Sequence, residues 1–108
     1  MRFYIGPNRD GVFAECDVYN RHQIVVLAGS TATKRELNKH YGPFIRHKSE
    51  LIADGVLVDN RNLYKFTKDC VFRAPTRAAA IILGNTGAAQ GLDVLKDAGG
   101  ITFRRYFT

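Results

Sequence analysis

The fold class is decided by residues 12–29, which read VFAECDVYNRHQIVVLAG. Residues 12–19 alternate loosely between apolar and polar side chains and are rich in β-branched and aromatic types, as half-buried strands are. Residues 23–29 form a continuous apolar run that is too short for an isolated helix. The polar residues between them predict a turn. The stretch therefore predicts a β-hairpin whose second strand is central in a sheet and covered on both faces.

Turn and strand signals extend this sheet in both directions along the chain. Residues 7–11 read PNRDG, and their Asp-Gly step favours a turn before the hairpin. Residues 3–5 predict a short edge strand, so that residues 1–11 supply an N-terminal strand and turn. Residues 56–58 and 63–67 predict a second hairpin around a polar turn.

Two segments predict short helices. Pro43 suits the first turn of one helix, which ends at the Asp54-Gly55 step. We expect its apolar side to hold Phe44, Ile45, Leu51 and Ile52, and its solvent side to hold Arg46, Lys48, Ser49 and Glu50. Residues 75–84 read PTRAAAIILG and predict a second helix, with proline at its start and glycine at its end.

The remaining chain completes an α+β prediction. Residues 92–96 and 101–106, joined by a glycine-rich turn, predict a closing hairpin. We therefore predict a single compact domain over residues 1–108, with a mostly antiparallel sheet built from β-hairpins and two short helices. A length of 108 residues suits one domain, and no apolar run reaches the ~18–20 residues that cross a bilayer.

The charge balance favours anionic partners. Sixteen Lys and Arg against ten Asp and Glu give a formal charge of +6, with a pI of about 9.6. Such an excess attracts polyanions, including nucleic acid, although it also serves merely to keep a small domain soluble. Cys16 and Cys70 form no C-x-x-C pair, and no secretory signal is evident. We expect two small buried hydrophobes in a reducing cytoplasm.

The sequence contains no recognisable catalytic or metal-binding pattern. His22, His40 and His47 show no metal-ligand spacing. Residues 84–91 are glycine-rich, but they follow a predicted helix and lack the lysine of a phosphate loop, so they predict a helix cap and a wide turn. Neither serine lies in a G-x-S-x-G pattern. The sequence thus predicts no enzyme, no metal and no cofactor.

A basic segment spans residues 34–48 and is opposed by one acidic residue, Glu36. Tyr41 and Phe44 lie within it, and cations mixed with aromatic rings suit phosphate contact and base stacking. The alternative is a solvated loop and helix face with two core aromatics. The candidate nucleic-acid contacts, on this segment and near the second helix, are Lys34, Arg35, Lys39, His40, Arg46, Lys48, Arg73 and Arg77.

The order of several motifs resembles a family of small bacterial domains of unknown function. Residues 25–32, VVLAGSTA, are similar to its V-V-L-x-G-S-x-A strand, and residues 46–57 are similar to its R-x-x-L-I-x-x-G-V-L helix and turn. The likeness is densest over residues 64–84, where the family reads F-T-x-D-x-x-F-x-S-P-S-x-A-A-x-x-V-L-G. The family-like region covers about residues 12–104.

The resemblance implies a role but no established activity. Domains of this family often follow GIY-YIG nuclease domains, and they resemble domains that accompany restriction methylases. This association with nuclease and methylase domains implies a nucleic-acid-binding accessory module for DNA or RNA, with a nuclease or methylase as partner. The open alternative is a protein-interaction domain that forms homodimers. Ala74, Gln90, Leu95 and Gly99 depart from the family pattern of Ser, Asn, Trp and Asp.

Overall fold

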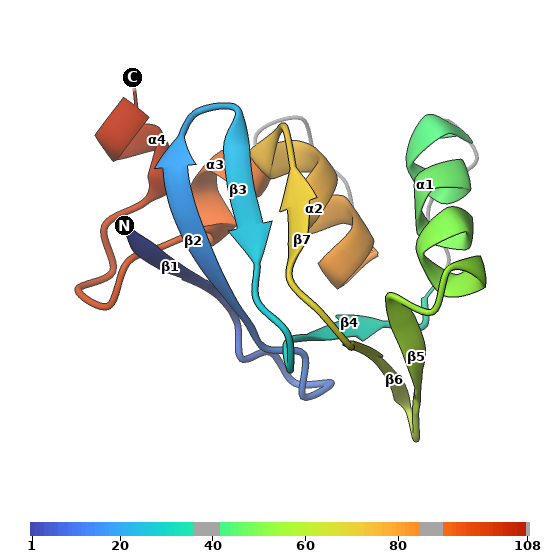
Figure 1. Ribbon diagram of the computed structural model, residues 1–108. Coiled ribbons are helices and arrows are strands. Elements are labelled where there is room, and N and C mark those ends of the chain that lie inside the picture. Colours follow the sequence, from blue (N-terminus) through green and yellow to red (C-terminus); the bar gives the residue numbers. More distant parts are fainter. Residues whose placement is uncertain (36–41, 85–89, 108) are drawn as a thin grey trace.

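Seven strands form two antiparallel sheets in the computed structural model, which describes residues 1–35, 42–84 and 90–107. The larger sheet has the order β1 (Arg2–Ile5), β2 (Ala14–Asn20), β3 (Gln23–Val26), β7 (Cys70–Phe72). The smaller sheet has the order β4 (Thr31–Thr33), β6 (Leu63–Phe66), β5 (Leu57–Asn60). The helices are α1 (Gly42–Ala53), α2 (Pro75–Leu83), α3 (Gln90–Val94) and α4 (Phe103–Phe107) (Figure 1). The predicted α+β class with antiparallel hairpins is confirmed.

The two faces of the larger sheet differ in polarity. Its inner face is formed by side chains in register across the strands, such as Val18, Ile24 and Phe72, which are all buried. Its outer face stays open to solvent, where Val71 is 51% exposed. The predicted hairpin and the central place of β3 are confirmed. The expectation that β3 is covered on both faces is wrong, because the helices pack on the inner face.

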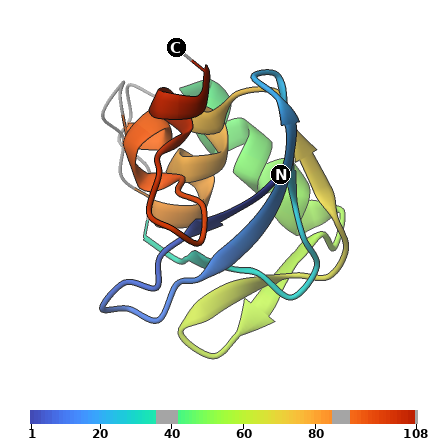
Figure 2. The same cartoon turned by 90° about the vertical axis from the view of Figure 1, so that its left-hand side faces the viewer.

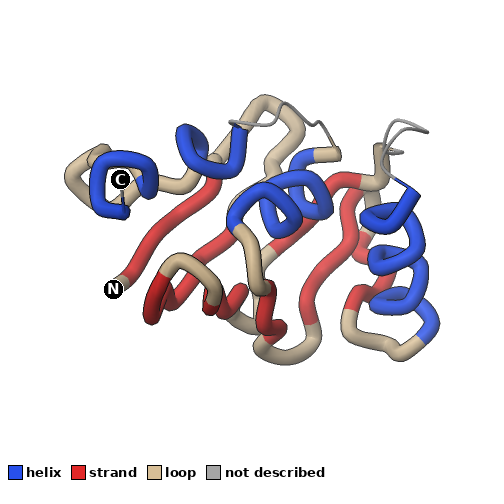
Figure 3. The backbone as a smooth tube through the Cα atoms, turned by 90° about the horizontal axis from the view of Figure 1, so that it is seen from above, coloured by secondary structure: helices blue, strands red, loops and turns tan. Residues whose placement is uncertain are grey.

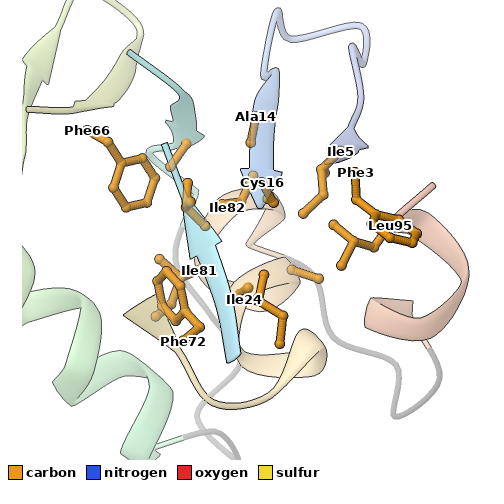
Figure 4. Close-up of a cluster of buried hydrophobic side chains, with 14 of the residues drawn as sticks. Phe3, Ile5, Ala14, Cys16, Ile24, Phe66, Phe72, Ile81, Ile82 and Leu95 are labelled. Carbon is orange, nitrogen blue, oxygen red and sulfur yellow. The ribbon is translucent and has the colours of Figure 1, made fainter. Parts of the chain in front are cut away.

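Helices α2, α3 and α4 together cover this inner face (Figures 2 and 3). Helix α2 has the predicted proline start and glycine stop, and its alanines 78–80 are buried where it approaches the sheets. Side chains from both layers meet in the core, where Phe72 and Ile81 lie close together and Phe3 lies beside Leu95 (Figure 4). The three alanines thus allow the close packing that the sequence predicted.

Helix α1 lies at one end of the row of helices, where it contacts α2 and strand β5 of the smaller sheet (Figure 3). It has the predicted extent and stop, and Gly55 adopts a left-handed φ of 74°. The expected division of its faces is wrong: Lys48 is buried with Leu51, whereas Ile45 and Ile52 are 36% and 39% exposed. The inward-facing positions are 44 and 47, which are half-buried, and 48 and 51, which are buried. Their spacing follows the 3.6-residue period of a helix, whereas two adjacent apolar pairs do not.

The smaller sheet contains the second predicted hairpin and a strand that the sequence did not predict. Strands β5 and β6 pair antiparallel, with Asn60 opposite Leu63. Arg61 in the two-residue turn between them has a φ of 61°, which a residue other than glycine rarely adopts. Strand β4 is only three residues long and is held by its pairing with β6. Strand β7 was likewise not predicted.

The predicted closing hairpin is wrong. Residues 90–94 and 103–107 are short helices, and between them Lys96 forms isolated bridges to Tyr4 and Thr102. The rings of Phe103 and Phe107 lie 4.5 Å apart, and Phe103 also contacts Phe3 of β1. Residues four positions apart meet on one helix face, so burial of this aromatic pair favours a helical turn over a strand. Over residues 1–35, 42–84 and 90–107, the fold therefore has four short helices instead of two.

Both cysteines are free thiols within the described residues. Burial raises the pKa of the Cys16 thiol to about 12, and it also raises the pKa of the half-buried Cys70 thiol. The predicted role of Cys16 as a buried hydrophobe is confirmed, whereas Cys70 is only partly covered. Across the described ranges, no helix has the length and apolar character needed to pass through a membrane.

Candidate nucleic-acid interface

The eight basic residues singled out in the sequence do not form one patch. Lys39 and His40 lie outside the described residues. Lys34 and Arg35 follow β4, and Arg46 lies on the exposed side of α1. Arg73 and Arg77 flank the start of α2, whereas Lys48 is buried behind β4. Figure 1 shows the connection from β7 to α2 at the top and β4 lower in the molecule, so the cations near α2 and those that follow β4 lie on different parts of the surface.

A hollow of about 390 Å³ opens at the lower end, between three segments of the chain. These segments are the β1–β2 loop, the residues that follow β4, and the β5–β6 turn. The residues lining this cationic hollow are Arg9, Asp10, Thr33, Lys34, Arg35, Asn62 and Leu63. Three cations against one carboxylate make it a concave surface of positive charge.

The β1–β2 loop carries Arg9 in a fixed position. The Asn8 side-chain oxygen accepts hydrogen bonds from the backbone amides of Asp10 and Val12, each at 3.0 Å. The Gly6 backbone has a φ of 82°, and a Cβ there would lie 2.4 Å from the Val12 carbonyl oxygen. A local side-chain cap and a tight glycine turn therefore hold the loop against the start of β2.

Ion pairs hold the two cations that follow β4. The Lys34 ammonium lies 2.6 Å from an Asp59 carboxylate oxygen and donates to the Arg61 carbonyl oxygen at 2.7 Å. The Arg35 guanidinium lies 3.1 Å from Asp10. These exposed pairs orient the cations, but each stabilises the fold by only about 0–1 kcal/mol. A phosphate group with two or three anionic oxygens can therefore compete with either carboxylate at little cost.

Lys48 lies directly behind the hollow. Its ammonium donates to the Thr33 carbonyl oxygen at 2.7 Å. It also lies 5.7 Å from the centre of the Tyr64 ring, and the Lys34 ammonium lies 5.5 Å from the same ring centre. Burial lowers the pKa of Lys48 to about 8. The side chain ties α1 to the end of β4, so it positions the backbone that carries Lys34 and makes no surface contact itself.

The buried ammonium predicts a pH-dependent stability. Because the native pKa of Lys48 lies below the ordinary lysine value of 10.5, the unfolded chain binds more protons between these pH values, and stability rises with pH. From pH 7 to pH 10, the free energy of unfolding of the wild type should rise relative to that of Lys48→Met by on the order of 1–3 kcal/mol. Urea unfolding of both proteins measures this difference. Parallel pH profiles would contradict the burial.

A second group of basic side chains lies where α1 and α2 begin. The Arg77 guanidinium stacks over the Phe44 ring at 4.9 Å, and the His47 ring lies 5.4 Å from that of Phe72. Burial and then the nearby Arg77 charge lower the pKa of His47, against a smaller opposite effect of Glu50. His47 is half-buried against Phe72 and does not lie on the solvent-facing side of α1. Arg77 packs on an aromatic ring at the junction of the two helices.

Sequence reasoning missed three residues of the hollow region: Arg9, Arg61 and Asn62. Each lies in a segment whose sequence predicts only a turn. All three lie outside the basic segment 34–48. The missing signal was β4, because its pairing with β6 brings residues 34–35 beside the turn at 61–62. The β1–β2 loop and the β5–β6 turn both carry cations and amides. Together with a predicted Thr-Ala-Thr strand, these two turns would have indicated the hollow.

No group of three or more His, Cys, Asp or Glu side chains is placed to hold a metal ion within residues 1–35, 42–84 and 90–107. The model of one protein family, described as a domain of unknown function (DUF4357), matches residues 3–106. The chain belongs to this family. No curated protein and no solved structure matches the chain. The family description gives this DUF4357 domain no activity, so its role has to be inferred from its own residues.

Proposed function

We propose that this DUF4357 domain is a non-catalytic nucleic-acid-binding module that holds the phosphate backbone at the cationic hollow. The observation that carries the proposal is the convergence of Arg9, Lys34 and Arg35 on one concave surface. Arginine and lysine at a concave surface are the groups that most often bind phosphate. The formal charge of +6 adds a long-range attraction for polyanions.

The electrostatics of the hollow favour phosphate over the carboxylates already present. Its lining holds Arg9, Lys34 and Arg35 against Asp10, and Asp59 pairs with Lys34. Arg61, next in sequence to the lining residue Asn62, is a fourth cation close to this surface. Asp10 accepts a hydrogen bond from Arg35, and Asp59 accepts one from Lys34. Each cation keeps further N–H donors, because a guanidinium has five N–H groups and an ammonium has three. A bound phosphate therefore gains donors that the ion pairs leave unused.

The resemblance to domains that accompany GIY-YIG nucleases and restriction methylases supports the same proposal by association. On this proposal the domain supplies nucleic-acid affinity, and a nuclease or methylase partner supplies the chemistry.

The alternative role, a protein-interaction or homodimerisation domain, uses other surfaces. Within the apolar C-terminal region, Leu95 and Phe103 are buried in the core, whereas Ile101 and Tyr106 are 40% and 43% exposed. Ile45 and Ile52 on the outer side of α1 remain exposed. Sedimentation at increasing protein concentration tests this alternative, and charge changes at the hollow would leave any self-association unaltered.

Salt-dependent binding tests the proposed function. With three or four phosphate contacts, log K should fall against log salt with a slope of about −2 to −3, which is roughly 15- to 60-fold between 50 and 200 mM. Fluorescence anisotropy with a labelled oligonucleotide measures this slope. A flat salt profile, or no binding at 50 mM salt, would overturn the proposal.

Arg61→Gly offers a variant that separates binding from folding. Glycine adopts the φ of 61° at this position without strain, so stability should stay equal or rise by about 0.5–1 kcal/mol. Loss of the Arg61 cation should nevertheless weaken oligonucleotide binding several-fold and make the salt slope shallower by about one phosphate contact. Thermal unfolding and anisotropy on the same samples measure both effects. Unchanged affinity would exclude Arg61 from the interface.

A further inference from the structure

Given that the hollow binds phosphate as proposed above, we infer that it takes a single unstacked nucleotide, and that the domain therefore prefers single-stranded nucleic acid to duplex. The size of the hollow is the first reason. About 390 Å³ lies within the range of roughly 300–1,000 Å³ typical of small-ligand sites. A duplex keeps its bases stacked inside a convex rod, so it can lie across the rim but cannot fill the hollow. One nucleotide of a single strand can enter it.

The chemistry of the walls is the second reason. Arg9, Lys34 and Arg35 supply the cations that suit a phosphate, whereas Asn62 and half-buried Leu63 supply an amide and an apolar surface. A carboxamide both donates and accepts, so it can pair with the hydrogen-bonding edge of a base. An apolar side chain offers contact to the flat face of the same base. Phosphate recognition alone would require neither Asn62 nor Leu63.

The rigidity of the surrounding turns is the third reason. Asn62 lies in a two-residue turn closed by the pairing of Asn60 with Leu63, and the Lys34 ammonium holds the Arg61 carbonyl beside it. On the opposite wall, Asn8 fixes the loop that carries Arg9. Both walls are therefore formed before the ligand arrives, which lowers the entropic cost of ordering a flexible single strand. Proteins that read single strands use unstacked bases in the same general manner.

Anisotropy titrations with matched ligands test this inference. The probes are one labelled eight-nucleotide DNA strand, the RNA of the same base sequence, and the DNA duplex, all at 50 mM salt. We expect at least tenfold tighter binding of a single strand than of the duplex. The DNA and RNA arms identify which backbone is preferred, and either preference agrees with the inference.

Two asparagine variants complete the experiment. Asn62→Ala should weaken single-strand binding roughly three- to tenfold and leave duplex binding unchanged. Asn60→Ala, an exposed position in the same hairpin that does not line the hollow, should change neither. Equal affinity for single strand and duplex, with Asn62→Ala neutral, would overturn the nucleotide site and leave the proposed function standing. Absence of binding to every probe would overturn both.

Discussion

The Gly91→Ala variant is expected to unfold roughly 10–20 °C below the wild type, from a loss of about 2–3 kcal/mol in stability. Gly91 in α3 is buried against the first turn of α2, and a Cβ there would lie 2.4 Å from the Pro75 carbonyl group and the Thr76 nitrogen. These contacts are backbone atoms, so no rotamer change can relieve the clash. The higher helix propensity of alanine, about 1 kcal/mol, offsets only part of the cost.

Gly42→Ala is the matched control for this variant. Gly42 also lies in the first turn of a helix, but a Cβ there would meet no atom within 4 Å. Its stability should therefore change by less than about 0.5 kcal/mol. Thermal unfolding followed by circular dichroism measures both variants. A Gly91→Ala protein as stable as the wild type would show that α3 does not cross α2 this closely.

The packing of α3 against α2 also affects the hollow, because α2 contacts residues that line it. Helix α2 ends at Gly84, where a Cβ would lie 2.7 Å from the Thr33 side chain and 3.1 Å from the Arg35 carbonyl oxygen. The end of α2 therefore packs against the segment that carries the cations after β4. A shift of α2 should disturb oligonucleotide binding as well as stability.

Reversal of two charges at the hollow should cause the largest loss of binding. Arg9→Glu combined with Arg35→Glu replaces attraction by repulsion at two of its walls and should weaken oligonucleotide binding on the order of 100-fold at 50 mM salt. Both side chains are exposed, so the fold should remain stable within about 1 kcal/mol. Anisotropy titrations and thermal unfolding measure the two effects.

A control with the same net charge separates the hollow from the overall positive field. Arg46→Glu combined with Arg73→Glu also lowers the formal charge from +6 to +2, since each reversal removes two charges. These residues lie on α1 and before α2, away from the hollow. Their reversal should weaken binding by less than about threefold. Equal losses in both double variants would mean that net charge, and not the hollow, attracts the ligand.

The predictable parts of the fold are those where local signals and burial agree. Helix α2 has proline at its start, glycine at its end and alanines on its buried side, and the structure reproduces each feature. The first hairpin has an alternating strand, a polar turn and an apolar strand, and it forms as predicted. In such segments the backbone preference and the burial pattern point to the same element.

The errors arise where distant contacts decide the local structure. Strand β4 has three residues and exists through its pairing with β6, so no local pattern indicates it. Lys48 was expected on a solvent face, but its long apolar stem reaches across the core to the Thr33 carbonyl. The C-terminal residues prefer a helical turn because Phe103 packs against Phe107 and against Phe3 of β1.

The candidate site was predictable only in its chemistry. A surplus of cations near residues 34–48 is evident from the sequence, and Lys34 and Arg35 do lie in the hollow. Arg9 and Asn62 join them through the topology of the two sheets, which brings two turns and a strand end together. Arg46 belongs to the same basic segment of the sequence, and Arg73 and Arg77 lie near the start of α2, but none of the three lines the hollow.

Phosphate binding at the cationic hollow is the central claim, and nuclear magnetic resonance tests it most directly. Backbone amide shifts would be recorded while a short single-stranded oligonucleotide is added at low salt. We expect the largest changes at residues 8–11, 33–35 and 61–63, which come from three separate parts of the sequence. Changes that cluster instead at the start of α1 and α2, or small changes spread evenly over the surface, would contradict this assignment.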